Sequence, residues 1–126
     1  MDDEEGLRVL LKTLLTNLGY EVQTARDGAE AIALCEEAKL SGRSFDAALL
    51  DLTVSGGMGG LEAVARLKEL APSMKLVVSS GYSDAAVISN FRKYGFDGVL
   101  PKPWKLAEVS QVLRKVFVSD PDRKAE

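Results

Sequence analysis

Hydrophobic residues recur along this chain at two spacings, one typical of helices and one typical of buried strands. From residue 7 to residue 18 leucines repeat at helical spacing, and Gly19 provides a stop. Residues 47–50 are instead a continuous apolar run, which predicts a central strand buried on both faces with Asp51 at its carboxyl end. The other predicted elements are strand 20–25, helix 28–40 with Asp27 as its N-cap, helix 61–70, strand 74–79, helix 83–93, strand 96–100 and helix 105–118.

Strands and helices alternate with short connections, which predicts an α/β domain with a doubly wound parallel sheet. We expect this domain to cover residues 1–118, and we expect the polar segment 119–126 to be a disordered tail. The count is uneven, because the pattern gives five helices but only four strands. The chain opens on a helix that is preceded only by the acidic cluster Asp2, Asp3 and Glu4.

The composition excludes several functional classes. A chain of 126 residues with a formal net charge of -3 forms one domain and offers no basic surface for nucleic acid. No apolar run reaches membrane-spanning length and the acidic start is unlike a signal peptide, so we expect a cytoplasmic location without membrane binding. The chain has no histidine, which excludes Ser-His-Asp triads, Cys-His pairs and the usual zinc sites. Cys35, the single cysteine, lies on a helical pattern and is expected to be a buried structural thiol.

Polar residues follow several of the predicted strands. Asp51 ends one strand, Ser79 and Ser80 end the next, and Lys102 comes just after the last. In a doubly wound sheet these residues and the acidic cluster converge on one rim. Clustered carboxylates repel one another and favour a divalent cation, and all-oxygen ligation favours Mg²⁺. A hydroxyl and an ammonium facing the same point suit phosphoryl oxygens, which indicates an aspartate nucleophile for phosphoryl transfer.

Each of these groups also has a structural interpretation. Asp2 and Asp3 are suited to the start of a helix, where acidic groups interact favourably with the dipole. Lys102 is compatible with a solvated loop, and Ser80 with a hydroxyl that caps a turn. Asp51 alone is compatible with a residue that only ends a strand and begins a turn.

Four motifs in this order resemble the CheY-like receiver domain of bacterial two-component response regulators. MDDEEGLR resembles the acidic-pair motif, and Asp51 falls at the phosphoacceptor position. Ser79-Ser80-Gly81 resembles the hydroxyl switch motif, and Lys102-Pro103 resembles a lysine followed by a proline whose bond is usually cis. The resemblance extends to about residue 117 and is greatest to receivers attached to hybrid sensor histidine kinases. It implies a flavodoxin-like fold with strand order 2-1-3-4-5.

The resemblance also implies a Mg²⁺ site. Asp3 and Asp51 would bind the ion directly, and the backbone carbonyl of Thr53 would be the last protein ligand. Asp2 would act largely through water. We therefore expect Mg²⁺ as the cofactor of this chain.

The implied activity is phosphoryl acceptance. Asp51 would receive a phosphoryl group from a phosphohistidine on a histidine kinase or a histidine phosphotransfer protein. Lys102, Ser80 and the backbone amide of Gly81 would hold the phosphoryl oxygens, and Thr53 would influence hydrolysis of the acyl phosphate. Movement of Ser80 would then reshape residues 82–93. Such a chain assists its own phosphorylation and dephosphorylation without being a stand-alone metabolic enzyme.

The sequence departs from the family in three places. Val99 stands where many receivers carry an aromatic residue, and the loop after Asp51 contains Ser55-Gly56-Gly57 where a proline and a shorter turn are usual. The third departure is the absence of the family's first strand, which lies mid-sheet and delivers the acidic pair. One hypothesis is that Met1 is an internal residue of a longer natural chain. The competing hypothesis is that rearrangement or a segment of a second molecule fills the gap, by dimerisation or strand exchange.

Two other functions remain open from the sequence. The first is a pseudo-receiver that keeps the fold and docks a partner without phosphorylation, which Val99 and the missing strand favour. The presence of Asp51, Lys102 and Ser80 favours the phosphoacceptor instead. The second is a flavin or dinucleotide binder of similar topology, but the sequence has no G-x-G-x-x-G motif opening a helix.

Overall fold

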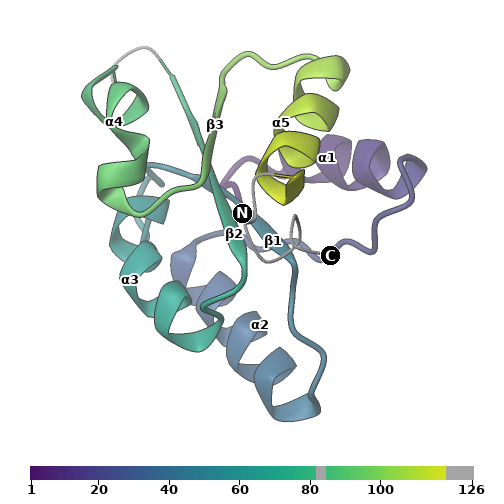
Figure 1. Ribbon diagram of the computed structural model, residues 1–126, viewed down its shortest axis with the longest axis vertical. Helices are drawn as coiled ribbons and strands as arrows, with labels where there is room; N and C mark the ends of the chain where they lie inside the picture. Colours follow the sequence, from purple (N-terminus) through teal and green to yellow (C-terminus); the bar gives the residue numbers. More distant parts are fainter. Residues whose placement is uncertain (82–84, 119–126) are drawn as a thin grey trace.

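Three parallel strands form the sheet of this chain (Figure 1). The structure is a computed structural model that describes residues 1–81 and 85–118. Within these residues the strands are β1 (Ala47–Asp51), β2 (Lys75–Ser80) and β3 (Gly98–Pro101), in spatial order β1-β2-β3. The three strands predicted at 47–50, 74–79 and 96–100 are therefore confirmed to within two residues at either end. The predicted tail and the predicted start of helix 83–93 lie outside the described residues.

β2, and not β1, is the middle strand of this sheet. Val77 and Val78 of β2 are fully buried, whereas residues 47–49 of β1 are only half-buried. The prediction that Asp51 ends a central strand is thus wrong within the described sheet, where Asp51 ends an edge strand. An apolar run indicates that both faces of a strand are covered, but it does not indicate whether both edges of the strand are hydrogen-bonded to neighbouring strands. The register places Asp51 opposite Ser79 of β2.

The strand predicted at residues 20–25 does not form. In the implied strand order this segment pairs with the first strand, and no such strand is present among residues 1–81 and 85–118. A lone segment without a neighbour gains no ladder hydrogen bonds, whatever its β-propensity. The carbonyl of Ala25 accepts a hydrogen bond from the backbone N–H of Asp2 at 3.1 Å, and Val22 packs against the hydrophobic cluster that includes Val77 of β2.

The helices follow the predicted pattern closely. They are α1 (Glu5–Asn17), α2 (Gly28–Ser41), α3 (Gly60–Leu70), α4 (Ala85–Ser89), the 3-10 helix η2 (Phe91–Tyr94) and α5 (Leu106–Val118). Asp27 is the N-cap of α2, as predicted, because its side chain accepts a hydrogen bond from the backbone N–H of Glu30 at 2.9 Å. Gly19 has a positive φ of 98° just beyond α1, which explains why this helix ends there.

The helix predicted at 83–93 is divided into α4 and η2. Asn90 separates the two, with a non-helical φ of -124° and ψ of 33°. Its side-chain amide donates a hydrogen bond to the carbonyl of Ala86 at 3.0 Å, which competes with continuation of the helix. Periodicity alone did not reveal this break.

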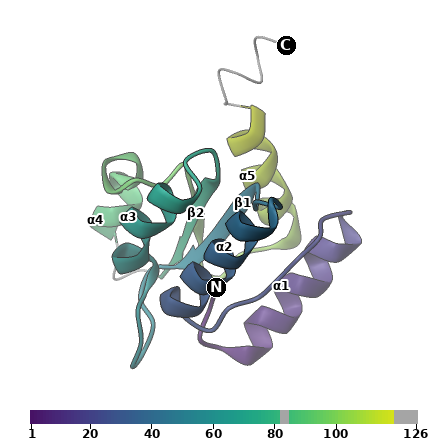
Figure 2. The ribbon, with the colours of Figure 1, turned by 90° about the horizontal axis from the view of Figure 1, so that it is seen from below.

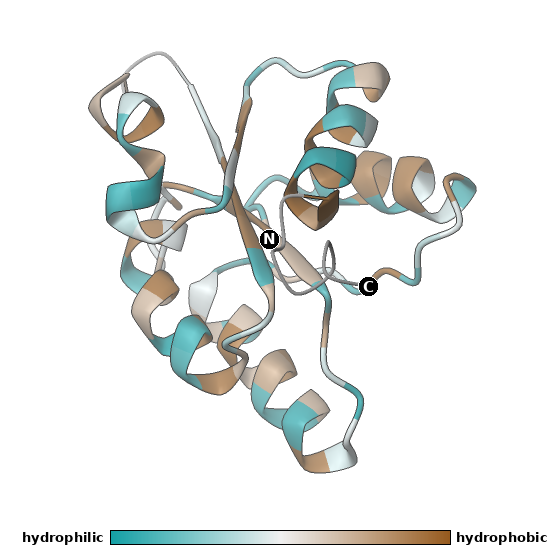
Figure 3. Cartoon of the chain, viewed as in Figure 1, coloured by the Kyte–Doolittle hydropathy of each residue, from teal (hydrophilic) through white to brown (hydrophobic). Residues whose placement is uncertain are grey.

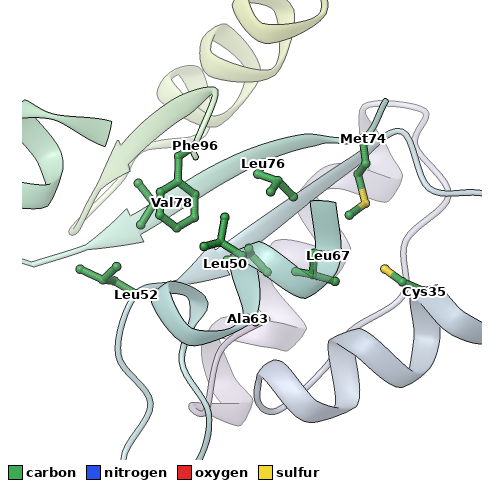
Figure 4. Packing of buried hydrophobic residues seen from close by; sticks show 10 residues of the cluster. Cys35, Leu50, Leu52, Ala63, Leu67, Met74, Leu76, Val78 and Phe96 are labelled. Carbon is green, nitrogen blue, oxygen red and sulfur yellow. The ribbon is translucent and has the colours of Figure 1, made fainter. Parts of the chain in front are cut away.

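The sheet has a hydrophobic cluster on each face because successive strand residues point in opposite directions. Leu76 and Val78 pack with Leu67 of α3 and Cys35 of α2 on one face, shown in Figure 4. Val77 packs on the other face with residues of α5 and with Leu15 of α1. The layering is visible in Figure 2, where α2 and α3 lie on one side of the strands and α1 and α5 on the other. The expectation that Cys35 is buried is confirmed.

Gly60 keeps the glycine-rich loop packed against the end of β1. A Cβ atom at this position would lie 2.9 Å from the backbone oxygen of Asp51 and 3.0 Å from Cβ of Leu50. Backbone atoms cannot yield as a flexible side chain can, so the contact would shift the loop or the strand. The positions of the loop and of Asp51 are therefore coupled through this contact.

Gly60→Ala is expected to lower the free energy of unfolding by about 1–3 kcal/mol through overpacking. Gly6→Ala is the matched control, because a Cβ atom there meets nothing within 4 Å. At this exposed helical position alanine should leave stability unchanged or raise it by up to about 1 kcal/mol. Urea denaturation followed by circular dichroism measures both, and equal midpoints for the two variants would contradict the proposed contact.

Candidate functional site

The predicted site residues lie at one end of the sheet. Asp51 is the last residue of β1, Ser80 is the last residue of β2, and Lys102 directly follows β3. Because the strands are parallel, their carboxyl ends open on the same rim, where binding sites of such sheets are found. Asp2 reaches this rim through the hydrogen bond to Ala25 and through its neighbour Met1, whose carbonyl accepts from the N–H of Asp51 at 3.0 Å.

Lys102 joins the two buried carboxylates. Its Nζ atom lies 3.1 Å from Oδ2 of Asp2 and 3.3 Å from Oδ1 of Asp51. The backbone N–H of Lys102 donates to the carbonyl of Ser80 at 2.8 Å, which fixes the start of the side chain beside β2. The Lys102–Pro103 peptide is cis, as the resemblance implied. Burial lowers the pKa of Lys102, but its hydrogen bond to Asp2 and the charge of Asp51 outweigh burial and raise it, so the amine stays charged.

Three carboxylates gather at this rim. One oxygen from each of Asp2, Asp3 and Asp51 lies within 4.8 Å of the others. Asp2 and Asp51 are 3% and 6% exposed, whereas Asp3 is exposed to solvent. Carboxylate oxygens without histidine or cysteine are the donors that Mg²⁺ prefers, and an exposed side leaves room for its waters. The donor set of this chain therefore fits Mg²⁺.

The pKa of Asp51 is raised to about 6. Burial is the largest cause, the charge of Lys102 opposes it, and the charges of Asp2 and Asp3 add to it. A single ammonium thus only partly compensates the clustered negative charge. A divalent cation would supply the remaining compensation and favour the ionised form of Asp51.

Asp2 also serves the start of α1. Its Oδ1 atom accepts a hydrogen bond from the backbone N–H of Glu4 at 2.9 Å. Asp2 is therefore both an acidic residue at the start of a helix and a member of the carboxylate cluster. Its carbonyl accepts from Nη1 of Arg8 at 2.7 Å. Sequence reasoning did not identify Arg8. Its position one turn into a helix that begins at an acidic cluster was the available signal.

Two serine hydroxyls at this rim are buried without a partner. Among the described residues, neither Ser79 Oγ nor Ser80 Oγ has a hydrogen-bond partner. An unsatisfied buried hydroxyl is unfavourable by about 1–3 kcal/mol, so a bound water or ligand oxygen is the expected partner. Ser80 was predicted to serve a ligand, whereas Ser79 was noted only as a strand end. The register that puts Ser79 beside Asp51 was not readable from the sequence.

The two remaining predicted residues lie in loops at the same end of the sheet. Thr53 is exposed two residues after Asp51, and Gly81 is half-buried directly after Ser80. A Cβ atom at Gly81 would meet nothing within 4 Å, so the space beside its amide is open. The roles of Thr53 and Gly81 stay predictions, because no contact of either residue bears on them.

None of the helices within residues 1–81 and 85–118 has the length and apolar character needed to cross a membrane. The longest of them, α2, has 14 residues. A span of the bilayer requires about 20.

The chain resembles known proteins along nearly its whole length. A family model described as "Response regulator receiver domain" matches residues 1–114. The chain is 30% identical over 117 residues to the chemotaxis protein CheY of Thermotoga maritima, and the match covers 92% of each chain. It is 24% identical over 115 residues to sporulation initiation phosphotransferase F of Bacillus subtilis, covering 91% of this chain and 88% of that protein. The structure of chemotaxis protein CheY4 of Vibrio cholerae matches with a TM-score of 0.79 at 26% identity, covering 91% of this chain and 92% of that one. The match to such structures confirms the predicted flavodoxin-like α/β fold.

Proposed function

Since the chain belongs to the response regulator receiver domain family of two-component signalling, we propose that Asp51 is its phosphoacceptor. The phosphoryl donor is a phosphohistidine on a histidine kinase or a histidine phosphotransfer protein, the partners with which receiver domains of this kind interact. The observation that carries the proposal is the position of Lys102 Nζ between the buried carboxylates of Asp2 and Asp51. Attachment to a hybrid sensor kinase stays a prediction.

The transfer forms one bond and breaks another. A carboxylate oxygen of Asp51 attacks phosphorus, and the bond from phosphorus to the imidazole nitrogen breaks. The electron pair of that bond stays on the imidazole, which takes up a proton and leaves as neutral histidine. Asp51 then carries an acyl phosphate. A carboxylate that is ionised and held in place by an ammonium is the form that this attack requires.

Mg²⁺ would be held by Asp3, Asp51 and the carbonyl of Thr53, with Asp2 acting through water. When bound, the ion neutralises charge on the phosphoryl oxygens. Lys102 stays within reach of Asp51 and offers its ammonium to a phosphoryl oxygen. The residues of this chain therefore contribute mostly positioning and charge compensation, as is usual in phosphoryl transfer.

The hydroxyl of Ser80 and the amide of Gly81 accommodate the remaining phosphoryl oxygens. The Ser80 hydroxyl is buried with no partner among the described residues, so a phosphoryl oxygen would satisfy it. Its movement toward the phosphoryl group would draw on the segment that follows, which includes α4 and η2. Water would later hydrolyse the acyl phosphate, with Thr53 at the side of the site influencing the rate.

Incubation with acetyl phosphate and Mg²⁺, read by intact-protein mass, tests the proposal. We expect a mass increase of one phosphoryl group that disappears in Asp51→Asn and when EDTA removes the metal. Asp46→Asn is the matched control, because Asp46 is an exposed aspartate just before β1, and it should keep the adduct. If the unmodified chain gave no adduct, or if Asp51→Asn kept it, the phosphorylation-independent docking domain would be the better interpretation.

A further inference from the structure

Ser79 and Ser80 end the middle strand with side chains on opposite faces of the sheet. Successive strand residues alternate between the two faces, and the residues just before the serines identify each face. Val77 packs with residues of α1 and α5, whereas Val78 packs with residues of α2 and α3. Ser79 therefore lies on the face of α1 and α5, and Ser80 lies on the face of α2 and α3. The two hydroxyls have different neighbours for this reason.

The strand register makes Asp51 a direct neighbour of Ser79. The two are paired residues of β1 and β2, and paired residues of parallel strands direct their side chains to the same face. The assignment of the face agrees with Leu49, two residues before Asp51, which packs against the cluster that contains Val77. The residue paired with Ser79 on the other side is Leu100 of β3, which is apolar and buried. Of its two paired neighbours, Asp51 is thus the one with a polar side chain.

The ion pair between Asp51 and Lys102 crosses the middle strand. β2 lies between β1, which ends at Asp51, and β3, which Lys102 follows. The Nζ atom of Lys102 is nevertheless 3.3 Å from Oδ1 of Asp51, so the lysine side chain extends across the end of β2. The backbone N–H of Lys102 donates to the carbonyl of Ser80 at 2.8 Å and keeps the start of this side chain beside β2. Ser79 therefore belongs to the strand end that the ion pair crosses.

The hydroxyl of Ser79 is buried and lacks a hydrogen bond. Ser79 is 7% exposed, and its Oγ atom has no hydrogen-bond partner among residues 1–81 and 85–118. The hydropathy colouring of β2 changes from brown along the strand to a pale tone at its carboxyl end (Figure 3). Buried hydroxyls in proteins are almost always hydrogen-bonded. The carboxyl group of Asp51 is the acceptor that the register brings beside this one.

Formation of an acyl phosphate on Asp51 would give the hydroxyl this acceptor. Neighbouring strands are about 4.8 Å apart, and rotation about the first side-chain torsion of serine moves Oγ toward the paired residue. In the structure Oδ1 of Asp51 pairs with the ammonium of Lys102. Phosphorylation transfers the negative charge from the carboxyl group to the phosphoryl oxygens, and the ammonium would follow this charge. The carboxyl group of Asp51 could then accept a hydrogen bond from Ser79.

We propose that Ser79 is a positioning residue that shortens the lifetime of the acyl phosphate by donating a hydrogen bond to the carboxyl group of Asp51. This inference rests on the proposed function. In hydrolysis the oxygen of water forms a bond to phosphorus, and the bond from phosphorus to the oxygen of Asp51 breaks. The electron pair of that bond stays on the departing carboxylate, and the water gives up its proton to solvent.

The hydrogen bond favours hydrolysis because it becomes stronger as the reaction proceeds. The carbonyl oxygen of an acyl phosphate is neutral, whereas the departing carboxylate of Asp51 is charged. A hydrogen bond to a charged oxygen is stronger than one to a neutral oxygen, so Ser79 stabilises the transition state more than the acyl phosphate. Ser79 thus acts on the reaction through Asp51, while Ser80 lies on the opposite face of the sheet.

The half-life of the acyl phosphate tests this role. The chain is phosphorylated with acetyl phosphate and Mg²⁺, the reagent is removed, and the loss of the adduct is followed by intact-protein mass. Ser79→Ala is expected to lengthen the half-life by about threefold to tenfold. Ser79→Thr keeps the hydroxyl and should return the half-life to within about twofold of the unmodified value. Ser44→Ala, at an exposed serine before β1, is the control and should leave it unchanged.

Two further measurements separate this role from a merely structural one. The melting temperature of unphosphorylated Ser79→Ala should equal or exceed that of the unmodified chain, because the variant removes a buried hydroxyl that has no partner there. Infrared difference spectra of the phosphorylated proteins report the carbonyl stretch of the acyl phosphate. A hydrogen bond lowers this frequency, so Ser79→Ala should raise it and Ser79→Thr should not.

The possible failures are distinguishable. Equal half-lives for Ser79→Ala and the unmodified chain would overturn this inference and leave the proposed function intact. Equally long half-lives for Ser79→Ala and Ser79→Thr, or a carbonyl frequency that Ser79→Ala does not change, would also overturn it. If the unmodified chain formed no adduct, the proposed function would fail, and this inference would fail with it.

Discussion

Lys102→Met is expected to lower the free energy of unfolding of the metal-free protein by about 3–5 kcal/mol near pH 7.5, because it removes the ammonium that pairs with two buried carboxylates. Lys102 Nζ lies 3.1 Å from Asp2 and 3.3 Å from Asp51, and its side chain is 23% exposed. The two carboxylates are themselves 3% and 6% exposed, so water cannot replace the ammonium. Methionine retains most of the length of the lysine side chain, so the charge is the main quantity removed.

The loss in Lys102→Met should be reversible by two independent means. Mg²⁺ should restore stability, because a divalent cation compensates the same carboxylates. Acid should restore it as well, because protonation of Asp51 removes one of the two charges. Lys93→Met, at an exposed position of η2, is the control and should change stability by less than about 0.5 kcal/mol. Urea denaturation with and without Mg²⁺ measures these effects. Equal midpoints for Lys102→Met and Lys93→Met, or no response to Mg²⁺, would contradict the role of the ammonium.

Asp51→Asn is expected to have the opposite effect and to raise the free energy of unfolding of the metal-free protein by about 2–3 kcal/mol above pH 6. Burial, with the charges of Asp2 and Asp3 adding to it and that of Lys102 opposing it, raises the pKa of Asp51 from 3.8 to about 6. The folded state therefore binds a proton more tightly than the unfolded state does. Asparagine removes the charge, and Lys102 keeps its ion pair with Asp2.

The pH dependence of this difference follows from the raised pKa. Above pH 6 Asp51 is ionised in both states, so the unfavourable burial of its charge is fully present and lowers stability. As the pH falls from about 6 to about 4, the folded state takes up the proton first and the unfavourable contribution disappears. The stability difference between Asp51→Asn and the unmodified protein should therefore shrink toward zero across this window. Denaturation midpoints of the two proteins at several pH values without Mg²⁺ measure this difference. A constant difference across the window would mean that the carboxylate is not desolvated.

Most of the local structure, and the residues that meet at the candidate site, could be predicted from the amino-acid sequence alone. Apolar periodicity located the helices and the three strands β1, β2 and β3. The spacing of apolar residues determines which faces of a helix or strand can be buried, and this spacing is visible in the sequence. Asp27 as an N-cap and Gly19 as a stop follow from side-chain and backbone chemistry within a few residues. The convergence of Asp2, Asp51 and Lys102 also followed, because parallel strands bring their carboxyl ends to one rim.

Features that depend on a neighbour in space could not be predicted in this way and are seen only in the folded chain. Residues 20–25 have a strand-like pattern but no strand, because ladder hydrogen bonds need a partner that local propensity cannot supply. β1 likewise lies at the edge of the three-stranded sheet, because no second strand pairs with it there, although its apolar run is typical of a central strand. The position of Ser79 beside Asp51 and the bond from Arg8 to the carbonyl of Asp2 likewise required the register and the helix placement. Sequence periodicity describes the faces of an element, whereas pairing along its edges is a property of the assembled sheet.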